Sequence, residues 1–229
     1  TGITSIFSYS FCECSGFNGN LILHEKLIVI DRYAFYHCSG FTGSLNLSDN
    51  INHIDDYAFA KCSGFIGTLK LPSKITFIKK NVFNGCHGFT GSLLIPNNVS
   101  EIYNYAFYGC YGFTGSLSIP ENVQRIYEYS FSNCKGFNGT LTFSPKLNEL
   151  GGSAFSGCNG FIGDLTIPNI RVIEERTFLD CSGFNGFLTI PDSVEQINEY
   201  AFSGCSHLIG SLKIPSKITN IQQGAFSGC

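Results

Sequence analysis

The sequence predicts a β-rich solenoid built from coils of 24 residues, with little helix. A phenylalanine and a cysteine, always three residues apart, recur along the whole chain. The step between successive cysteines is 24 residues everywhere except for one step of 23, from Cys158 to Cys181. Between these positions the apolar residues alternate over short segments, as in strands. A fixed period between 20 and 50 residues is typical of a solenoid, in which each repeat packs only on its neighbours.

Two columns of residues define the period. The phenylalanines are Phe11, Phe35, Phe59, Phe83, Phe107, Phe131, Phe155, Phe178, Phe202 and Phe226. The cysteines are Cys14, Cys38, Cys62, Cys86, Cys110, Cys134, Cys158, Cys181, Cys205 and Cys229. A single coil cannot bury its own apolar side chains, so we expect equivalent residues to stack in one continuous core.

The first element of each coil is a short strand, such as Leu93 to Ile95, in which apolar and exposed positions alternate. Proline has no backbone N–H and ends a strand, so Pro96 marks the end of this one. The same column continues at Pro72, Pro120, Pro168, Pro191 and Pro215, whereas Pro145 is displaced by one residue.

A second extended stretch follows around Ile102, and a tight turn is expected from Ala106 to Cys110. Tyr103 and Tyr105 favour extended backbone at this point. Two glycines, as at Gly88 and Gly91, bracket the next corner in most coils, where a positive φ or a close backbone approach favours glycine.

Residues 1–229 are therefore expected to form a single array of about nine to ten coils, whose two ends both lie within the repeat pattern. We expect the end coils either to fray or to associate end to end. The net charge is −3 and there is no basic stripe, which argues against a nucleic-acid partner. No apolar run reaches the length of a membrane span.

The cysteines allow two interpretations. There is no C-x-x-C pair and no Cys-His cluster at zinc spacing, so no metal site is predicted. Stacked coils would place neighbouring cysteines about 5 Å apart, within the Cα range of a disulfide. Their Cβ atoms would nevertheless run parallel and lie too far apart. We favour buried, reduced thiols that act as small apolar residues; some bridges are the alternative.

A stripe of tyrosines precedes the Ala-Phe step and is the main candidate for partner contact, because tyrosine is common in binding surfaces. The alternative is that these tyrosines pack only on their own copies. The predicted contact residues are Tyr103, Tyr105, Tyr127 and Tyr129, with Tyr33 and Tyr57 along the same stripe. Leu94 and Phe187 interrupt the hydroxyl-rich outer positions of the strands. They are either further contact points or chance departures.

Other functional signals are weak. Asn46, Asn98 and Asn138 lie in N-x-S/T sequons, which are near chance frequency in this composition. The five histidines share no column, and no nucleophile, phosphate-binding or dinucleotide motif is present. We therefore predict a non-enzymatic protein without catalytic residues or cofactor.

The skeleton I-P-x-x-V-x-x-I-x-x-x-A-F-x-x-C resembles the BspA-like, Treponema-type class of leucine-rich repeats. Matching segments run from Ile95 to Cys110 and from Ile190 to Cys205, and the resemblance covers essentially the whole chain. It implies a curved, right-handed array with a parallel sheet of L-x-I strands on the concave face. It also implies surface display or secretion, and adhesion to host cells or matrix proteins. The 24-residue period is one residue longer than the common version, and the asparagine ladder of ordinary leucine-rich repeats is missing.

The leading hypothesis is a protein-binding module on the cell surface or outside the cell, with a host-cell or matrix protein as partner. The first alternative is a structural element that self-associates through its uncapped ends. A glycan-binding surface is the second alternative.

Overall fold

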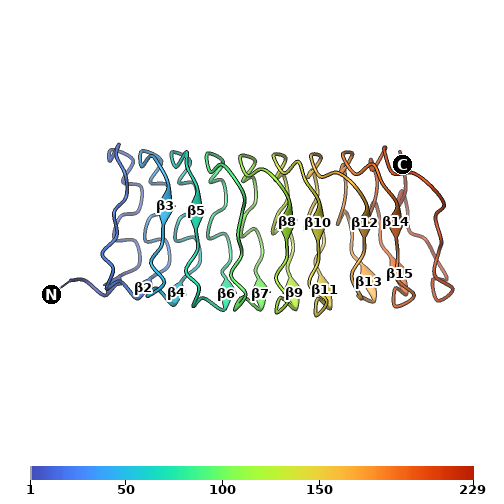
Figure 1. Ribbon diagram of the computed structural model, residues 1–229, viewed down its shortest axis with the longest axis horizontal. Helices are drawn as coiled ribbons and strands as arrows, with labels where there is room; N and C mark the ends of the chain where they lie inside the picture. The colour runs from blue at the N-terminus through green and yellow to red at the C-terminus, as the bar shows by residue number, and fades with distance from the viewer. Residues whose placement is uncertain (1) are drawn as a thin grey trace.

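A computed structural model describes residues 2–229 of the chain, and these residues form a solenoid of stacked coils without any helix (Figure 1). The two termini lie at opposite ends of the stack. This confirms the predicted solenoid of parallel strands. None of the described residues belongs to a helix that could cross a membrane.

Each regular coil contributes two strands of two residues. The first row of strands begins at the leucine of L-x-I, and the first residue is turned inward. It comprises β3 (Leu45–Asn46), β5 (Leu69–Lys70), β8 (Leu117–Ser118), β10 (Leu141–Thr142), β12 (Leu165–Thr166) and β14 (Leu188–Thr189). Equivalent leucines pair with each other in parallel, for example Leu45 with Leu69.

The second row precedes the turn and has its inward residue in second place. It comprises β1 (Ser5–Ile6), β2 (Val29–Ile30), β4 (His53–Ile54), β6 (Phe77–Ile78), β7 (Glu101–Ile102), β9 (Arg125–Ile126), β11 (Glu149–Leu150), β13 (Val172–Ile173) and β15 (Gln196–Ile197). The sheet β6-β7-β9-β11 is the longest uninterrupted part of this row. The predicted second extended stretch around Ile102 is thus confirmed.

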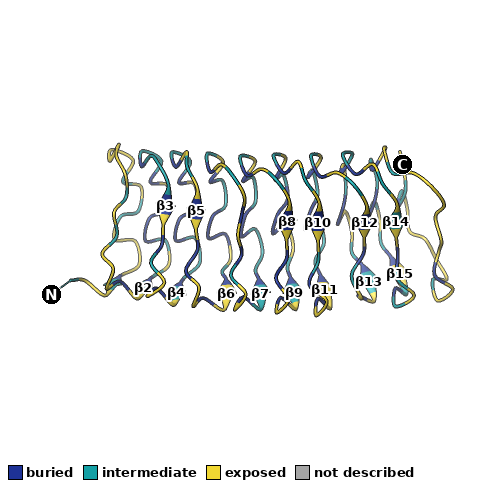
Figure 2. Cartoon of the chain, viewed as in Figure 1, coloured by how far each residue is buried: buried dark blue, intermediate teal, exposed yellow. Residues whose placement is uncertain are grey.

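The core is a continuous stack of phenylalanine rings from Phe11 to Phe226. Neighbouring rings are nearly parallel, and their centroids lie 5.1–5.9 Å apart. The rings from Phe35 to Phe202 are almost completely buried. Burial alternates within every inner coil, whereas the outermost coils are mostly exposed (Figure 2). The sequence alternation therefore correctly predicted which side chains face inward.

The turn begins earlier than predicted, and its tyrosines are not extended. Tyr105 has a φ of 59° and Tyr129 a φ of 57°, both in the left-handed region. Amide groups along the turn alternate between local and inter-coil hydrogen bonds. Ala106 N–H donates to Tyr103 within the turn, while Phe107 N–H donates to Ser130 of the next coil. Tyr33 and Tyr57 have the same left-handed backbone, with φ values of 56° and 60°. The inter-coil bonds, rather than local propensity, fix this backbone.

The strand predicted from Leu93 to Ile95 does not form. Both side chains are buried as expected, but the only pairing next to them is an isolated bridge between Gly91 and Phe113. Side-chain alternation requires only that the apolar groups face the core. A ladder also requires neighbouring coils to approach within hydrogen-bonding distance along their full length.

The glycine corner behaves as predicted. Gly91 has a φ of 76°, a conformation that residues with a side chain rarely adopt. Gly88 has an ordinary φ, but a Cβ there would collide with the backbone oxygens of the preceding coil. One glycine of the pair is thus needed for its φ and the other for close packing.

The ladder is interrupted between the coil of β10 and β11 and the coil of β12 and β13. Neither β10 with β12 nor β11 with β13 forms a pair in the described chain. We call this junction the seam. The coils still meet at the phenylalanine turn, where Phe155 N–H donates to Thr177 O at 3.0 Å. In Figure 1 the seam is visible as a wider interval between these strands.

Three departures from the repeat meet at the seam. Phe143 stands at the third position of the L-x-I segment, where other coils have an isoleucine such as Ile119. Its ring contacts both Phe155 and Phe178 edge-on. The link between β12 and β13 spans residues 167–171, one fewer than the 143–148 link before it. Gly151 lies so close to Tyr127 and Glu128 that a Cβ would collide with their backbone. We expect these three departures to contribute to the interruption, although among the described residues the second row is also unpaired between β4 and β6, where none of them occurs.

Candidate partner-binding face

Two pairs of tyrosines form the centre of the predicted contact stripe. The rings of Tyr105 and Tyr129 stack at 4.7 Å, and those of Tyr103 and Tyr127 stack at 5.0 Å. All four side chains are half-buried. The structure therefore brings the four predicted residues together, and they also pack on their own copies. The stacking on equivalent residues is observed, and contact with a partner stays a prediction.

Tyr33 and Tyr57 form a separate group nearer the N-terminus. Their rings stack at 4.6 Å, and the guanidinium of Arg32 lies 5.2 Å and 6.0 Å from the two ring centroids. Asn81 occupies the same column position, with a φ of 56°, and separates this group from Tyr105. The stripe is consequently divided into two surfaces.

Charged side chains contact Tyr127 at the edge of the central tyrosine group. Glu101 accepts hydrogen bonds from Arg125 Nη1 at 3.0 Å and from the Tyr127 hydroxyl at 3.1 Å. Arg125 also lies 3.7 Å from a carboxylate oxygen of Glu149. Partial burial, the largest cause, raises the pKa of Tyr103 and of Tyr105 above the ordinary tyrosine value. These hydroxyls stay protonated at neutral pH and can donate hydrogen bonds to a partner.

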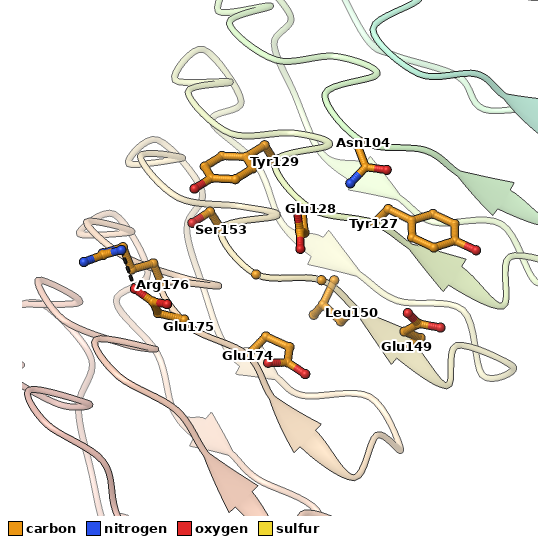
Figure 3. Close-up of a pocket in the computed structure, with 12 residues that line it drawn as sticks. Asn104, Tyr127, Glu128, Tyr129, Glu149, Leu150, Ser153, Glu174, Glu175 and Arg176 are labelled. Atoms are coloured by element: carbon orange, nitrogen blue, oxygen red, sulfur yellow. Dashed lines mark ion pairs between the residues drawn. The ribbon is translucent and has the colours of Figure 1, made fainter. Parts of the chain in front are cut away.

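Next to Tyr129, over the segment from Gly151 to Ser153 that borders the seam, lies a recess that we call the glutamate hollow. Its volume is about 400 Å³. It is lined by Asn104, Tyr127, Glu128, Tyr129, Glu149, Leu150, Gly151, Gly152, Ser153, Glu174, Glu175 and Arg176. Figure 3 shows Glu128 and Glu174 on opposite sides of the segment that runs from Leu150 to Ser153. The predicted residues Tyr127 and Tyr129 form one wall, whereas Tyr103 and Tyr105 lie behind them.

The hollow is acidic. Its lining contains four glutamates and one arginine, and Arg176 already pairs with Glu175. Glu149 is near Arg125, and Glu174 accepts a hydrogen bond from the Asn198 amide at 2.8 Å. Among the described residues, Glu128 and Glu174 have no cationic side chain within ion-pair distance. Two carboxylates are therefore left without a countercharge.

Sequence reasoning did not identify the hollow. Gly151, Gly152 and Ser153 stand where the preceding coil has Tyr127, Glu128 and Tyr129, so three small side chains leave the space empty. The signal was present in the sequence as a coil without a tyrosine, directly before the 23-residue step. A second recess of about 670 Å³, lined by residues such as Phe143, Pro145 and Pro168, opens from the first-row side of the same seam.

Leu94 lies in the unpaired segment from Leu93 to Ile95, and Phe187 directly precedes β14. Neither residue lines the glutamate hollow. Both are exposed, with 76% and 55% of their surface accessible. Some hydroxyls at the outer positions of the strand segments bond to each other across neighbouring coils; for example, Thr140 Oγ1 donates to Ser116 Oγ at 3.2 Å.

The three sequon asparagines Asn46, Asn98 and Asn138 are all exposed. Asn98 donates its amide to Ser73 O, and Asn138 accepts a hydrogen bond from Gly115 N. Glycosylation at any of these positions stays a prediction.

The cysteine ladder forms a buried column beside the phenylalanine stack. From Cys38 to Cys205 the thiols are buried, and each donates a hydrogen bond to a phenylalanine carbonyl of the preceding coil. Burial raises the pKa of Cys86 and Cys158 to about 12. No group of His, Cys, Asp and Glu in residues 2–229 has the arrangement of a metal site.

The fold and this face define a leucine-rich repeat module of stacked coils. A family model for the BspA type leucine rich repeat region matches in six copies, over residues 1–114 and 113–229. The chain therefore belongs to the BspA-type leucine-rich repeat family, which confirms the resemblance seen in its A-F-x-x-C motif.

Solved structures show the same fold. A leucine rich repeat protein from T. pallidum is 24% identical, with a TM-score of 0.58 over 68% of this chain and 70% of that one. A leucine-rich repeat protein from Bacteroides ovatus is 18% identical, with a TM-score of 0.59 over 99% of this chain and 74% of that one. No curated protein matches the chain.

Proposed function

We propose that the chain is a non-enzymatic protein-binding module that is displayed on a cell surface or secreted, and that adheres to host cells or matrix proteins. The observation that carries this proposal is the central tyrosine group beside a recess. Tyr105 and Tyr129 present their ring edges and hydroxyls on a backbone fixed by hydrogen bonds to both neighbouring coils.

Such a surface is suited to protein recognition for two physical reasons. Tyrosine offers a large contact area while losing little side-chain entropy, and its hydroxyl provides a polar contact. The inter-coil bonds hold the rings before a partner arrives, so less ordering is needed on binding. The repeat architecture adds an elongated face along which several coils can contact one partner.

The test compares binding of host cells and of a panel of purified matrix proteins to the wild type and a double variant, Tyr105→Asn with Tyr129→Asn. Asparagine is suitable because Asn81 occupies the same column with the same left-handed backbone. The control is Leu94→Thr in the unpaired segment from Leu93 to Ile95. Loss of binding in the tyrosine variant alone supports the proposal. Equal binding by all three proteins excludes this face, and no binding by the wild type contradicts the adhesion role.

Self-association through the end coils is the alternative that one observation favours. Ile3, Phe17 and Ile22 of the first coil are exposed, and so are Ile209 and Leu212 of the last. Light scattering across protein concentration distinguishes the two: a rise in mass that Ile22→Ser suppresses supports self-association, and a constant monomer mass excludes it.

A further inference from the structure

We infer that the glutamate hollow receives an arginine side chain of a protein partner, with the guanidinium lying on the exposed face of Tyr129. This inference rests on the proposed protein-binding function and specifies the chemistry of its central contact. It goes beyond the tyrosine stripe because it assigns a site over the segment from Gly151 to Ser153 and a single type of occupant.

The tyrosine column itself shows the contact twice. Arg32 lies over Tyr33, and Arg176 lies over Tyr200 with its guanidinium carbon 5.4 Å from the ring centroid. Arg176 lies on the coil before Tyr200 and occupies the same repeat position that a tyrosine has in other coils. At Tyr129 the corresponding neighbour on the following coil is Ser153, so no ring or guanidinium of the column covers that side. Guanidinium groups stack favourably on tyrosine faces.

The charge of the hollow selects a cation. Glu128 and Glu174 line it from the two neighbouring coils and have no cationic partner within ion-pair distance among residues 2–229. A guanidinium is planar and can donate parallel hydrogen bonds to a carboxylate, whereas a lysine ammonium acts as a compact point charge. Glu128 lies on the same side of the Leu150–Ser153 segment as Tyr129, whereas Glu174 lies on the other side and accepts one hydrogen bond from Asn198 (Figure 3). A ring face next to carboxylates without a countercharge therefore favours arginine over lysine.

The size of the recess and the backbone around it agree with an inserted side chain. The volume of about 400 Å³ lies at the low end of the roughly 300–1,000 Å³ typical of ligand pockets. Because the seam lacks strand pairing, no backbone hydrogen bond joins Leu150 O to Glu174 N in the described chain. These two peptide groups remain available to the partner or to water.

The experiment uses the whole chain and the peptide acetyl-Gly-Arg-Gly-amide, with acetyl-Gly-Gln-Gly-amide as neutral control and the lysine peptide as comparison. Amide resonances are followed by NMR. We expect saturable shifts centred on Gly151 and Gly152 with the arginine peptide, weaker shifts with lysine and none with glutamine. The affinity should fall as salt is raised from about 0.05 M to about 0.5 M, since the site is open to solvent.

Two variants test the two parts of the site. Ser153→Tyr restores the residue that other coils have at this left-handed position, and it fills the hollow without removing a charge. Glu128→Gln with Glu174→Gln removes the charge without filling the space. We expect the first to abolish the shifts and the second to weaken the affinity about fivefold, in line with exposed ion pairs and cation–π contacts. The control Glu121→Gln changes a carboxylate that pairs with Lys146 away from the hollow.

The outcomes separate this inference from the proposed function. If the peptide does not bind, or if it binds Ser153→Tyr as well as wild type, the inference is wrong even where matrix proteins still bind. If the peptide binds as expected but no host cell or matrix protein does, the arginine site stands and the adhesion proposal fails. Equal binding of the glutamine peptide would also contradict the inference.

Discussion

The thiol of Cys134 donates a hydrogen bond to the backbone carbonyl of Phe107, 3.1 Å away on the preceding coil. The same contact links Cys110 to Phe83 and Cys158 to Phe131. The Phe107 carbonyl also accepts a hydrogen bond from Cys110 N–H at 3.1 Å, so the thiol supplies its second bond. Phenylalanine and cysteine therefore recur together because they join successive coils, the ring by stacking and the thiol by this second hydrogen bond. A typical intramolecular hydrogen bond contributes about 0.5–1.5 kcal/mol net to stability.

Thiol labelling should divide the eleven cysteines into two sets. Cys12, Cys14 and Cys229 are accessible and should react in the folded protein, whereas the eight buried thiols should react only after unfolding. Counting thiols with a chromogenic disulfide, with and without denaturant, gives both numbers. A count near zero in denaturant, without reductant, would show that the ladder is bridged.

The stability of the array should fall at alkaline pH. Burial raises the pKa of Cys86 and Cys158 to about 12 in the folded protein, from an ordinary value of 9.0. Between these values the unfolded chain loses the proton while the folded chain keeps it. The stabilisation is therefore complete below pH 9 and is lost as the pH rises toward 12, by about 1.4 kcal/mol per pH unit for each thiol. Denaturant unfolding at about pH 8 and about pH 10.5 measures this, and Cys86→Ala should reduce the slope. An equal slope in that variant would contradict the assignment.

Removal of one ring from the phenylalanine stack should be costly. Phe107 is completely buried and stacks on Phe83 and Phe131 at 5.6 and 5.3 Å. Phe107→Ala should lower the free energy of unfolding by about 3–5 kcal/mol. Phe187→Ala is the matched control, because that ring is exposed and should cost much less. Similar unfolding midpoints for the two variants would exclude the stack as the main source of stability.

Two glycines of one coil should respond differently to alanine. Gly109 has a φ of 69° and open space where a Cβ would lie, so Gly109→Ala should cost only the left-handed backbone, about 1–2 kcal/mol. Gly112 lacks a positive φ, but its Cβ would collide with the carbonyl of Phe89. Gly112→Ala should therefore cost more, because neighbouring coils must separate. Thermal unfolding of both variants checks the order, and the reverse order would show that coil contact is looser here.

Restoring the period should close the seam. Insertion of a serine after Asn169 gives the link between β12 and β13 the same length as in other coils. Phe143→Ile places at this position the isoleucine that other coils have in their L-x-I segment. In the preceding coil Gly151 N–H donates to Ile126 O, whereas Glu174 N–H makes no equivalent bond to Leu150 O in the described chain. We expect the variant to form this bond, so that the Glu174 amide exchanges with deuterium more slowly than in the wild type. The amide of Gly151 serves as internal control. An unchanged rate at Glu174 would mean that these departures do not cause the seam.

Most of the fold could be predicted from the sequence, because the 24-residue period and the inward columns both follow from local pattern. The columns of Phe107 and Cys110 lie where the period places them. The predicted conformation of Tyr105 was wrong, because inter-coil hydrogen bonds override its preference for extended backbone. The strand predicted at Leu93 failed because alternation reports burial and says nothing of the distance between coils.

The candidate site was predicted only in part. The grouping of Tyr105 with Tyr129 follows from their shared column, since a repeat places equivalent residues above one another. The hollow depends on Gly151, Gly152 and Ser153, which look ordinary in isolation and matter because the surrounding coils fill the same positions. The shortened link of residues 167–171 follows one coil further on, and none of its residues lines the hollow.

The seam has a consequence for how such arrays diversify. Coils contact only their immediate neighbours, and the ring stack continues from Phe155 to Phe178 across the shortened repeat. A change of one residue in the length of one coil is therefore accommodated locally, while the rings on both sides of it remain stacked. Such arrays can accordingly vary in length or side chain at one coil while the scaffold around it is kept.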